Sequence, residues 1–339
     1  MTKTYTVAVV GATGAVGGEM IEILETRNFP VGRLVPLASE KSLGKYIDYK
    51  GKDVPVAVLD EKSFEDVDIA LFSAGGDVSK KFVPLAVESG AVVIDNTSAF
   101  RMDDDVPLVV PEVNPEALER YKARNIIANP NCSTIELVVA LKPLHDRARI
   151  KRIVVSTYQA VSGAGLKAME ELSKQSVGLF SEGECKVEVF PHRIAFNCIP
   201  HIGLFDDSGF TVEELKLMNE TKKILGDGSI AVVATAVRVP VFCSHAESVN
   251  VEFESEISPE DAREILSSAK GVSVIDDPGL CKYPLQSESS GKDEVFVGRI
   301  RADQTVKNGL CMWIVSDNLR KGAALNAVQI AEELVAGHL

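Results

Sequence analysis

The chain has 339 residues, of which 45% are hydrophobic and 25% charged, a composition typical of a globular protein large enough for two domains. Because 36 Lys and Arg residues face 49 Asp and Glu residues, the net charge is −13, which excludes a general nucleic-acid-binding role. No apolar stretch approaches the ~20 residues that span a bilayer, and the N-terminus has no signal or transit pattern. We therefore expect a cytoplasmic protein that does not bind membranes.

Strands and helices alternate in the first third of the chain. Apolar runs predict strands, and longer amphipathic segments predict helices. The predicted strands are residues 4–10, 33–38, 68–73, 91–94, 108–110 and 125–128, and the predicted helices are residues 19–26 and 78–88. This alternation predicts an α/β domain with a Rossmann-type, doubly wound parallel sheet over residues 1–131.

The pattern changes after residue 131, where strands follow one another with fewer helices between them. The predicted helices are residues 133–144, 166–180 and 211–226, and the predicted strands are residues 152–159, 231–239, 248–254, 295–300 and 310–315. This order predicts an α+β domain with a mixed sheet over residues 132–316. A final helix over 318–335, capped by Ser316 or Asp317, is expected to complete the first domain with segment 317–339.

A glycine-rich loop joins the first strand to the first helix. Residues 11–17 read Gly-Ala-Thr-Gly-Ala-Val-Gly, a G-x-x-G-x-x-G variant of the dinucleotide-binding fingerprint. Glycines permit the tight turn and let backbone N–H groups approach a pyrophosphate at the helix N-terminus. Where the second strand ends, Ser39, Lys41 and Ser42 can hold a 2′-phosphate, whereas Glu40 repels one unless it points away. This loop favours NADP, although a polar surface loop explains each residue equally well.

One of the six cysteines stands at the start of a predicted helix. Asn131 is a candidate N-cap, which places Cys132 in the first turn, where the helix dipole is expected to lower the pKa of the thiol and make it a nucleophile. No C-x-x-C pair or compact zinc framework is present, so no metal site is expected. Buried, inert thiols are expected at Cys185, Cys198, Cys281 and Cys311.

Three polar residues lie at the ends of predicted strands in the second domain. His245 stands at a junction between strands and suits acid–base chemistry, because a histidine pKa ordinarily lies near neutrality. Arg238 can direct two donors to a carboxylate. Gln159 ends a strand just before a small-residue loop, residues 162–165, and can donate to a carbonyl or an oxyanion.

Further charged residues have both a functional and a structural interpretation. Arg101 follows a strand end in the first domain, where open α/β sheets bind their ligands, and is a candidate anion ligand. Glu213 and Lys216 share one helix face. Such a pair is more often a solvated ion pair on the protein surface. In the functional interpretation, the two residues offer one charge of each sign to a zwitterionic substrate.

In combination, these motifs resemble the aspartate-semialdehyde dehydrogenase family over essentially the whole chain. The matching segments are residues 11–17, 39–42, 73–76, 95–101, 129–134, 156–165, 213–216, 238–245 and 317–329. The resemblance implies reversible, NADP-dependent reductive dephosphorylation of L-4-aspartyl phosphate to L-aspartate 4-semialdehyde through a cysteine thioester. That step serves lysine (through diaminopimelate), threonine and methionine biosynthesis.

The resemblance also implies roles for individual residues. Cys132 is the nucleophile, His245 the acid–base and Gln159 a further catalytic residue. The implied substrate-binding residues are Arg238 for the α-carboxylate, Glu213 for the α-ammonium, Arg101 and Lys216 for the phosphate, and Ser98 and Asn131 nearby. The implied cofactor-binding residues are Gly11, Thr13, Gly14, Ala15, Val16, Ser39, Lys41, Ser42, Gly75, Ser162, Gly163 and Asn318. Family members form homodimers or homotetramers through the catalytic domain, and the other partners are the small-molecule substrate and inorganic phosphate.

One departure and three alternatives stay open. Family members often carry Ala-Arg where this chain has Glu40-Lys41, so strict preference for NADP over NAD is not settled. A reductase of N-acetyl-glutamyl phosphate is disfavoured by Glu213, because an acetylated amine has no positive charge to pair with. The sequence around Cys132 fits a glyceraldehyde-phosphate dehydrogenase poorly. A catalytically silent NADP-binding protein is disfavoured because both Cys132 and His245 are present.

Overall fold

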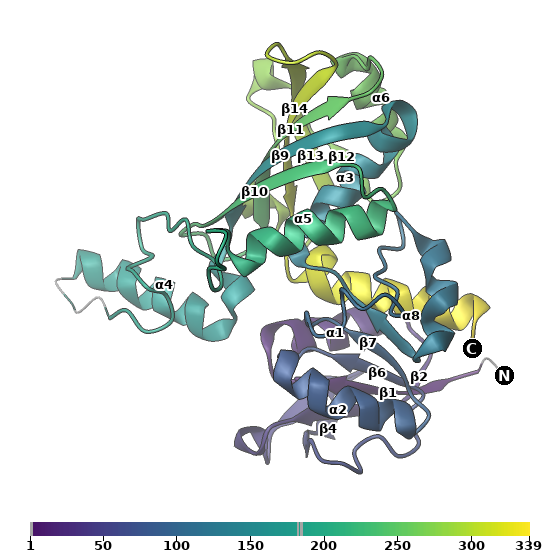
Figure 1. Ribbon diagram of the computed structural model, residues 1–339. Coiled ribbons are helices and arrows are strands. Elements are labelled where there is room, and N and C mark those ends of the chain that lie inside the picture. Colours follow the sequence, from purple (N-terminus) through teal and green to yellow (C-terminus); the bar gives the residue numbers. More distant parts are fainter. Residues whose placement is uncertain (1–2, 182, 184–185) are drawn as a thin grey trace. The chain divides into compact units, whose positions relative to one another are not determined.

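The chain forms two compact units, seen here in a computed structural model that describes residues 3–181, 183 and 186–339. The first unit is Met1–Asn131 together with Ala323–Leu339, and the second is Cys132–Gly322. Figure 1 shows the sheets and helices of each unit. The sequence placed the return to the first unit at residue 317, and the structure places it six residues later, at Ala323.

The first unit is built on a six-stranded sheet in which every strand pair is parallel. The strand order is β5-β2-β1-β6-β7-β8, so the chain runs outward from β1 in both directions. The strands are β1 Tyr5–Val10, β2 Val31–Ala38, β5 Ala57–Val58, β6 Ile69–Phe72, β7 Val92–Asp95 and β8 Ile126–Ala128. The predicted doubly wound parallel sheet is confirmed. A hairpin of β3 (Tyr46–Tyr49) and β4 (Lys52–Pro55) lies outside this sheet and was not predicted.

Helices α1 (Ala15–Thr26) and α8 (Leu325–Gly337) share one hydrophobic core with the sheet of the first unit. Met20 and Leu24 of α1 meet Val328 and Leu334 of α8 over alternate residues of β1, such as Val9. Helix α2 (Gly76–Glu88) packs against β7, and a 3-10 segment (Pro115–Ala123) precedes β8. The C-terminal helix therefore belongs to the core of the unit that the N-terminus begins.

The predicted strand at residues 108–110 is not present, and the prediction is wrong. Only an isolated bridge joins Leu108 to Ala128. The side chain of Asn114 explains the interruption, because its Oδ1 accepts from the Val110 N–H at 2.9 Å and its Nδ2 donates to the Leu108 carbonyl at 2.9 Å. An amide side chain thus takes the place of a neighbouring strand.

The second unit contains a mixed six-stranded sheet, as predicted. Its order is β10-β9-β11-β14-β13-β12. The strands are β9 Ile150–Gln159, β10 Ala231–Arg238, β11 His245–Phe253, β12 Val272–Val274, β13 Val295–Asp303 and β14 Gly309–Ser316. The β9–β10 and β12–β13 pairs are parallel, and the three central pairs are antiparallel.

Helices α3 (Cys132–Ala148) and α5 (Val212–Leu225) pack together and against this sheet. Thr211 begins α5 with a capping box, accepting from the Glu214 N–H while the Glu214 carboxylate accepts from the Thr211 N–H. Helix α4 (Leu166–Phe180) extends from the sheet, as Figure 1 shows, and α6 (Pro259–Ser268) was not predicted. A four-residue helix, α7 (Gln286–Ser289), precedes β13.

The final predicted helix begins differently from the expectation. A π-helical turn occupies Arg320–Ala324, and the regular α-helix starts only at Leu325. Asp317 does cap this segment, as predicted, because its Oδ1 accepts from the N–H groups of Leu319 at 2.8 Å and Arg320 at 3.2 Å. The helix pattern in the sequence was correct, but it could not distinguish a π turn from an α turn.

Candidate active site

Three of the predicted site residues meet at one edge of the sheet in the second unit. Gln159 ends β9 and Arg238 ends β10, and the two are register partners in a parallel pair. β11 runs antiparallel to β9, and its first residue, His245, lies next to Ala246, which pairs with Tyr158. The ends of β9 and β10 and the start of β11 therefore coincide.

The backbone of Ala160 ties two of these side chains together. Its carbonyl accepts from Arg238 Nη1 at 2.6 Å, and its N–H donates to His245 Nδ1 at 3.1 Å. A neutral imidazole that accepts at Nδ1 carries its proton on Nε2. Among the described residues, nothing accepts a hydrogen bond from that Nε2. His245 thus presents an N–H donor to any ligand that arrives.

Burial makes His245 a neutral residue. Its pKa is lowered from 6.5 to about 3, first by burial and then by the positive charge of Arg238, while Glu213 opposes the change. The prediction that its pKa lies near neutrality is therefore wrong. At neutral pH, this side chain acts as a hydrogen-bond donor and not as an imidazolium.

Cys132 begins α3, so the prediction that its thiol lies in the first turn is confirmed. The residue keeps some exposed surface, but the pKa of its thiol is raised from 9.0 to about 12. Burial is the largest cause, followed by the charges of Glu213 and Glu136, and Arg238 and Lys216 oppose them.

The predicted lowering of the Cys132 pKa is therefore wrong. The rise corresponds to about 4 kcal/mol, whereas a helix dipole contributes ~0.3–1 kcal/mol. The loss of water around the sulfur outweighs the dipole, so the thiol is neutral at pH 7.

Glu213 and Lys216 form an ion pair inside the site, and the interpretation as a solvated surface pair is wrong. Lys216 Nζ lies 3.0 Å from Glu213 Oε2, and Glu213 is buried. Gln159 Nε2 donates to Ser133 Oγ at 2.9 Å and faces Glu213 Oε1 at 3.4 Å. Helix α5 thus brings one charge of each sign to the sheet edge that carries Gln159.

The small-residue loop after β9 lies directly against the histidine and the arginine. A Cβ atom at Gly163 would lie 3.0 Å from Arg238 Nη1 and 3.2 Å from His245 Nε2. Ser162 Oγ meets Asn318 Oδ1 at 3.0 Å, and the Ser244 N–H donates to the same oxygen at 2.9 Å. Of the predicted cofactor residues, Ser162, Gly163 and Asn318 therefore belong to the second unit and lie together.

Four of the other predicted cofactor residues, Gly11, Thr13, Gly14 and Ser39, line a hollow in the first unit. Its volume is about 590 Å³, and Gly11, Thr13 and Gly14 line it together with Ser73 and Ala74. It opens beyond the ends of β1 and β6, the switch point at which sheets of this order bind dinucleotides. Ala15 and Val16 start α1, whose first N–H groups have no partner within the helix, and Gly75 precedes α2 with φ 96°.

The glycine loop fits a dinucleotide for a steric reason. Gly11 has φ +88°, and a Cβ atom there would lie 2.5 Å from the Ser73 carbonyl oxygen. A Cβ atom at Gly17 would lie 2.2 Å from the Gly11 carbonyl oxygen. Both glycines are required for the turn that leaves the hollow open, which is the arrangement a pyrophosphate needs.

The loop at residues 39–42 divides its side chains between two tasks. Ser42 is buried and its Oγ lies 3.0 Å from Thr13 Oγ1, so it holds the glycine loop. Ser39 and Glu40 line the hollow, whereas Lys41 is exposed and is not among the described residues that line it. Glu40, whose direction the sequence left undecided, thus lines the hollow on the side where a 2′-phosphate is expected.

Arg101 is buried in the first unit and held by backbone carbonyls. Its Nε donates to the Asn129 carbonyl at 2.9 Å and its Nη2 to the Asn96 carbonyl at 2.8 Å. Its charge lowers the pKa of Asp95, although burial is the larger effect and raises it. Ser98 is exposed in the same loop, and Asn131 is buried immediately before Cys132.

The predicted burial of the other thiols is wrong at each of the three that the structure describes. Cys198 and Cys281 are exposed, and Cys311 is half-buried. Cys185 lies outside the described residues. Among the described residues, no group of three or more His, Cys, Asp or Glu side chains is placed to hold a metal ion. None of the described helices combines the length and the apolar character that a membrane span requires.

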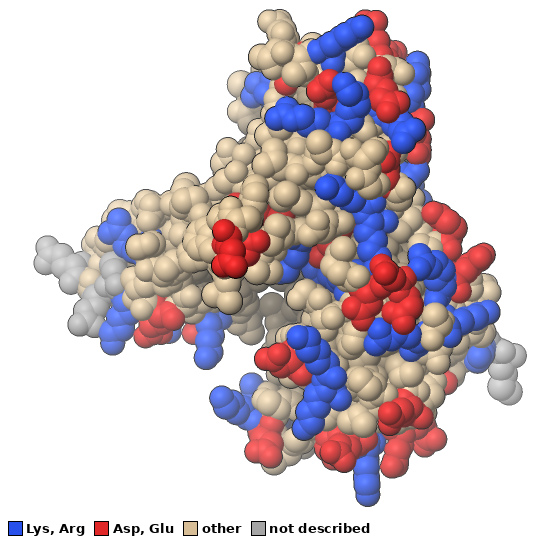
Figure 2. All heavy atoms as spheres, in the orientation of Figure 1, with Lys and Arg blue, Asp and Glu red and all other residues tan. Residues whose placement is uncertain are grey.

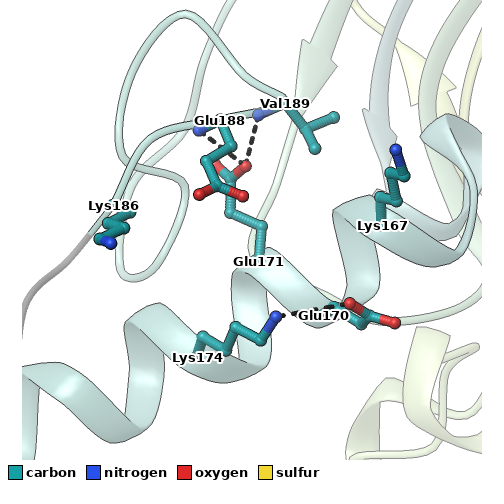
Figure 3. Close-up of a pocket in the computed structure, with 7 residues that line it drawn as sticks. All are labelled: Lys167, Glu170, Glu171, Lys174, Lys186, Glu188 and Val189. Atoms are coloured by element: carbon teal, nitrogen blue, oxygen red, sulfur yellow. Dashed lines mark hydrogen bonds and ion pairs between the residues drawn. The ribbon is translucent and has the colours of Figure 1, made fainter.

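A second hollow, of about 510 Å³, lies beside α4 and contains no predicted site residue (Figure 3). Three of its charged side chains have partners. Glu171 accepts from the N–H groups of Glu188 and Val189, and Lys174 pairs with Glu170. The contacts of Glu171 fasten the loop after α4 to the helix.

Sequence reasoning missed two buried carboxyl groups close to the site. Glu136 lies one helical turn after Cys132 and Glu247 two residues after His245, and both are fully buried. A signal was present, because Glu136 stands within an apolar run, Ile135 to Leu141, where a charge is unusual.

Comparison with known proteins covers both units. Residues 6–121 match the family model described as the NAD-binding domain of semialdehyde dehydrogenases, and residues 141–321 match the dimerisation domain. An aspartate-semialdehyde dehydrogenase of Aquifex aeolicus is 58% identical over 333 residues, which is 98% of each chain. A Bacillus subtilis protein of the same name is 50% identical, covering 97% of this chain and 96% of the relative.

Solved structures agree with these matches. The aspartate semialdehyde dehydrogenase II of Vibrio cholerae, complexed with ASA, is 50% identical, with a TM-score of 0.96 and full coverage of both chains. The Candida albicans aspartate semialdehyde dehydrogenase with NADP is 28% identical with a TM-score of 0.77, covering 98% of this chain and 99% of that one.

The lowered pKa of His245 predicts a specific acid sensitivity. The unfolded chain takes up a proton near pH 6.5 and the folded chain only near pH 3, so this residue's contribution to stability is lost as the pH falls below 6.5. Between pH 7 and pH 5, the loss amounts to about 2 kcal/mol.

Urea unfolding at the two pH values tests this expectation. Between pH 7 and pH 5, the free energy of unfolding should fall by about 2 kcal/mol less in His245→Asn than in wild type. In His192→Asn, a control at an exposed position, it should fall as much as in wild type. Equal pH dependence in wild type and His245→Asn would contradict the assignment of a neutral, buried imidazole.

Proposed function

Because the chain belongs to the aspartate-semialdehyde dehydrogenase family, we propose that it converts L-4-aspartyl phosphate into L-aspartate 4-semialdehyde and inorganic phosphate, reversibly and with NADP as cofactor. This step would serve lysine (through diaminopimelate), threonine and methionine biosynthesis. The observation that carries the proposal is the sheet edge at which His245, Arg238 and Gln159 meet, close enough to Cys132 for the charge of Arg238 to lower the pKa of its thiol against the larger effect of burial.

Cys132 is the nucleophile of this proposal. Its sulfur forms a bond to the acyl carbon, the carbon–oxygen bond to phosphate breaks, and phosphate leaves with the electron pair and the thiol proton. The product of this half-reaction is a thioester on Cys132. When bound, the nicotinamide cofactor supplies the hydride that reduces the thioester to the oxidation level of the aldehyde.

His245 stabilises the oxygen that becomes negative in the reduction. Its Nε2–H is an unused donor in a buried site, where a hydrogen bond to an oxyanion is stronger than in water. Cleavage of the carbon–sulfur bond then releases the aldehyde and the thiolate, which takes up one proton. The neutral state of His245 favours this role as a donor.

The charges around Cys132 suit an amino-acid substrate. Arg238 is buried, and its Nε has no partner among the described residues, so we assign it to the α-carboxylate. Glu213 is assigned to the α-ammonium and Lys216 to the phosphate. The Glu213–Lys216 pair at 3.0 Å keeps each charge satisfied until the substrate offers the opposite partners. Gln159 lines the same site through its contact with Glu213.

Arg101 remains the proposed second phosphate ligand. Its Nε and Nη2 donate to carbonyl oxygens, which orient a guanidinium without neutralising its charge. Ser98 and Asn131 likewise stay predicted substrate-binding residues near the phosphate.

The nicotinamide cofactor is assigned to the hollow in the first unit, with Gly11, Thr13 and Gly14 against the pyrophosphate. We propose NADP over NAD on the strength of Ser39 and Lys41, and the position of Glu40 opposes this choice. The family relative of Candida albicans crystallised with NADP supports the proposal.

A homodimer is proposed through the second unit, because residues 141–321 match a dimerisation domain. Large apolar side chains are exposed on α4 and the segment that follows it, with Phe180 80% and Leu204 79% exposed. Phe180 and Phe196 form an edge-to-face pair with ring centroids 5.6 Å apart. Figure 2 shows that much of the face around α4 carries few charged atoms. Such a surface is typical of an interface between subunits.

Turnover tests the proposed reaction. The purified protein should reduce NADP in the presence of L-aspartate 4-semialdehyde only when phosphate is added, followed by the absorbance of NADPH. Cys132→Ser should lower the rate by about a thousandfold or more, because serine is far less nucleophilic than a thiolate. Cys311→Ser, in the middle of a strand pair, should retain activity and serves as the matched control.

Two outcomes of that assay would contradict the proposal. Undiminished activity in Cys132→Ser would rule out a thioester on Cys132 as an intermediate. Folded protein that binds NADP but turns over no semialdehyde would contradict the substrate and favour a silent cofactor-binding protein.

The cofactor choice depends on a single charge. Glu40→Ala should tighten binding of NADPH by about tenfold, equivalent to ~1.4 kcal/mol, because the carboxylate no longer repels a 2′-phosphate. Binding of NADH, measured in the same fluorescence titration, should change little and is the internal control. An equal effect on both cofactors would show that Glu40 does not face the 2′ position.

The proposed interface is tested by oligomeric state. Phe180→Glu should shift the protein from dimer towards monomer in sedimentation velocity, because a charge cannot be buried cheaply in an apolar interface. Leu43→Glu, at a position that is 71% exposed in the first unit, is the matched control and should leave the dimer intact. A Phe180→Glu protein that stays dimeric at low concentration would place the interface elsewhere.

A further inference from the structure

Behind the nucleophile and the histidine, the same two elements carry a second pair of side chains. Glu136 lies four residues after Cys132 on α3, so both lie on one face of the helix. Glu247 lies two residues after His245 on β11, so both point to one face of the sheet. Helix α3 packs against β11, and Glu136 and Glu247 interact electrostatically.

Both carboxyl groups are buried without ordinary compensation. Glu136 is 1% and Glu247 0% exposed. None of their four oxygens has a partner in hydrogen-bond geometry among the described residues, and the nearest donor, the Ser316 N–H, only partly offsets the burial of Glu136. Lys321, also fully buried, has a polar interaction of its own and is not among the charges that shift Glu136. A carboxylate removed from water without a partner is unstable, so such a group keeps its proton.

The surrounding charges reinforce this effect. Burial is the main cause that raises the pKa of Glu136, and the charges of Glu247 and Asp317 raise it further. The Ser316 backbone N–H has the opposite effect and lowers this pKa. Burial likewise raises the pKa of Glu247.

Asp317, the third acid of this group, is already hydrogen-bonded. Its two carboxyl oxygens accept from the N–H groups of Gly291, Leu319 and Arg320. The oxygens of Glu136 and Glu247 have no such donors in hydrogen-bond geometry among the described residues. Their burial therefore favours the protonated form of these two groups.

The protonation state of Glu136 matters for the nucleophile. In its charged form, Glu136 raises the pKa of the Cys132 thiol, as Glu213 does. Neutralising Glu136 removes one of the two negative charges that oppose formation of the thiolate.

We propose that Glu136 and Glu247 are positioning residues that hold at least one proton between them behind Cys132 and His245, and that this proton keeps negative charge away from the sulfur at neutral pH. The proposal rests on Cys132 being the nucleophile, as the proposed function has it. It assigns Glu136 and Glu247 a role through Cys132 and no contact with substrate.

Alkylation of Cys132 by iodoacetamide, followed by mass spectrometry of its peptide, tests the coupling without turnover. In wild type, ionisation of Glu136 and Glu247 at high pH should oppose formation of the Cys132 thiolate. Glu136→Gln imitates the protonated form, so its alkylation rate should be within about twofold of wild type at pH 6 and about tenfold faster by pH 10, since one pKa unit is a tenfold change.

Glu252→Gln is the matched control on the same strand. Glu252 pairs with Lys151 near the far end of β11, so its removal should leave the profile unchanged. A ratio of Glu136→Gln to wild type that stays constant from pH 6 to pH 10 would overturn the proposal. Purely structural damage would change the rate without this pH dependence.

Infrared spectroscopy of the wild-type chain provides a second measurement in case the variants do not fold. A carbonyl band of a protonated carboxylic acid should persist at pH 7, where exposed carboxylates are ionised. The absence of that band would overturn the proposal. Neither measurement uses substrate or cofactor, so failure of the proposed reaction and failure of this inference are distinguishable.

Discussion

The site depends on the register of three strands and on one backbone unit between them. Parallel pairing of β9 with β10, and antiparallel pairing of β9 with β11, brings the ends of two strands and the start of a third to one edge. At that edge, the carbonyl of Ala160 holds Arg238 and its N–H holds His245. Because a one-residue slip turns each side chain to the other face of the sheet, this register determines the orientation of every polar group described there.

Burial then determines the protonation states. The thiol of Cys132 and the imidazole of His245 are both neutral at pH 7, since loss of water disfavours the charged form of each. The same effect keeps a proton on the carboxyl pair of Glu136 and Glu247. Charge is thus concentrated on Arg238 and on the Glu213–Lys216 pair, which are the groups suited to recognising a charged amino acid.

The first unit follows a different constraint, which is steric. The turn requires glycine at positions 11 and 17, because a Cβ atom at either would collide with a carbonyl oxygen. The turn stands where the strand order reverses, so the hollow follows from topology and from glycine together.

The sequence by itself determined the two sheets, the position of Cys132 at a helix start, the glycine turn and the family. These features follow from periodicity, glycine placement and motif order, which are local along the chain. It could not determine the pKa of Cys132 or His245, the burial of Glu213, or the pairing of Glu136 with Glu247. It also mistook residues 108–110 for a strand, because the Asn114 side chain takes the place of a neighbouring strand. Each of these depends on which distant residues exclude water or donate hydrogen bonds, and only the tertiary structure decides that, because desolvation acts through space and not along the sequence.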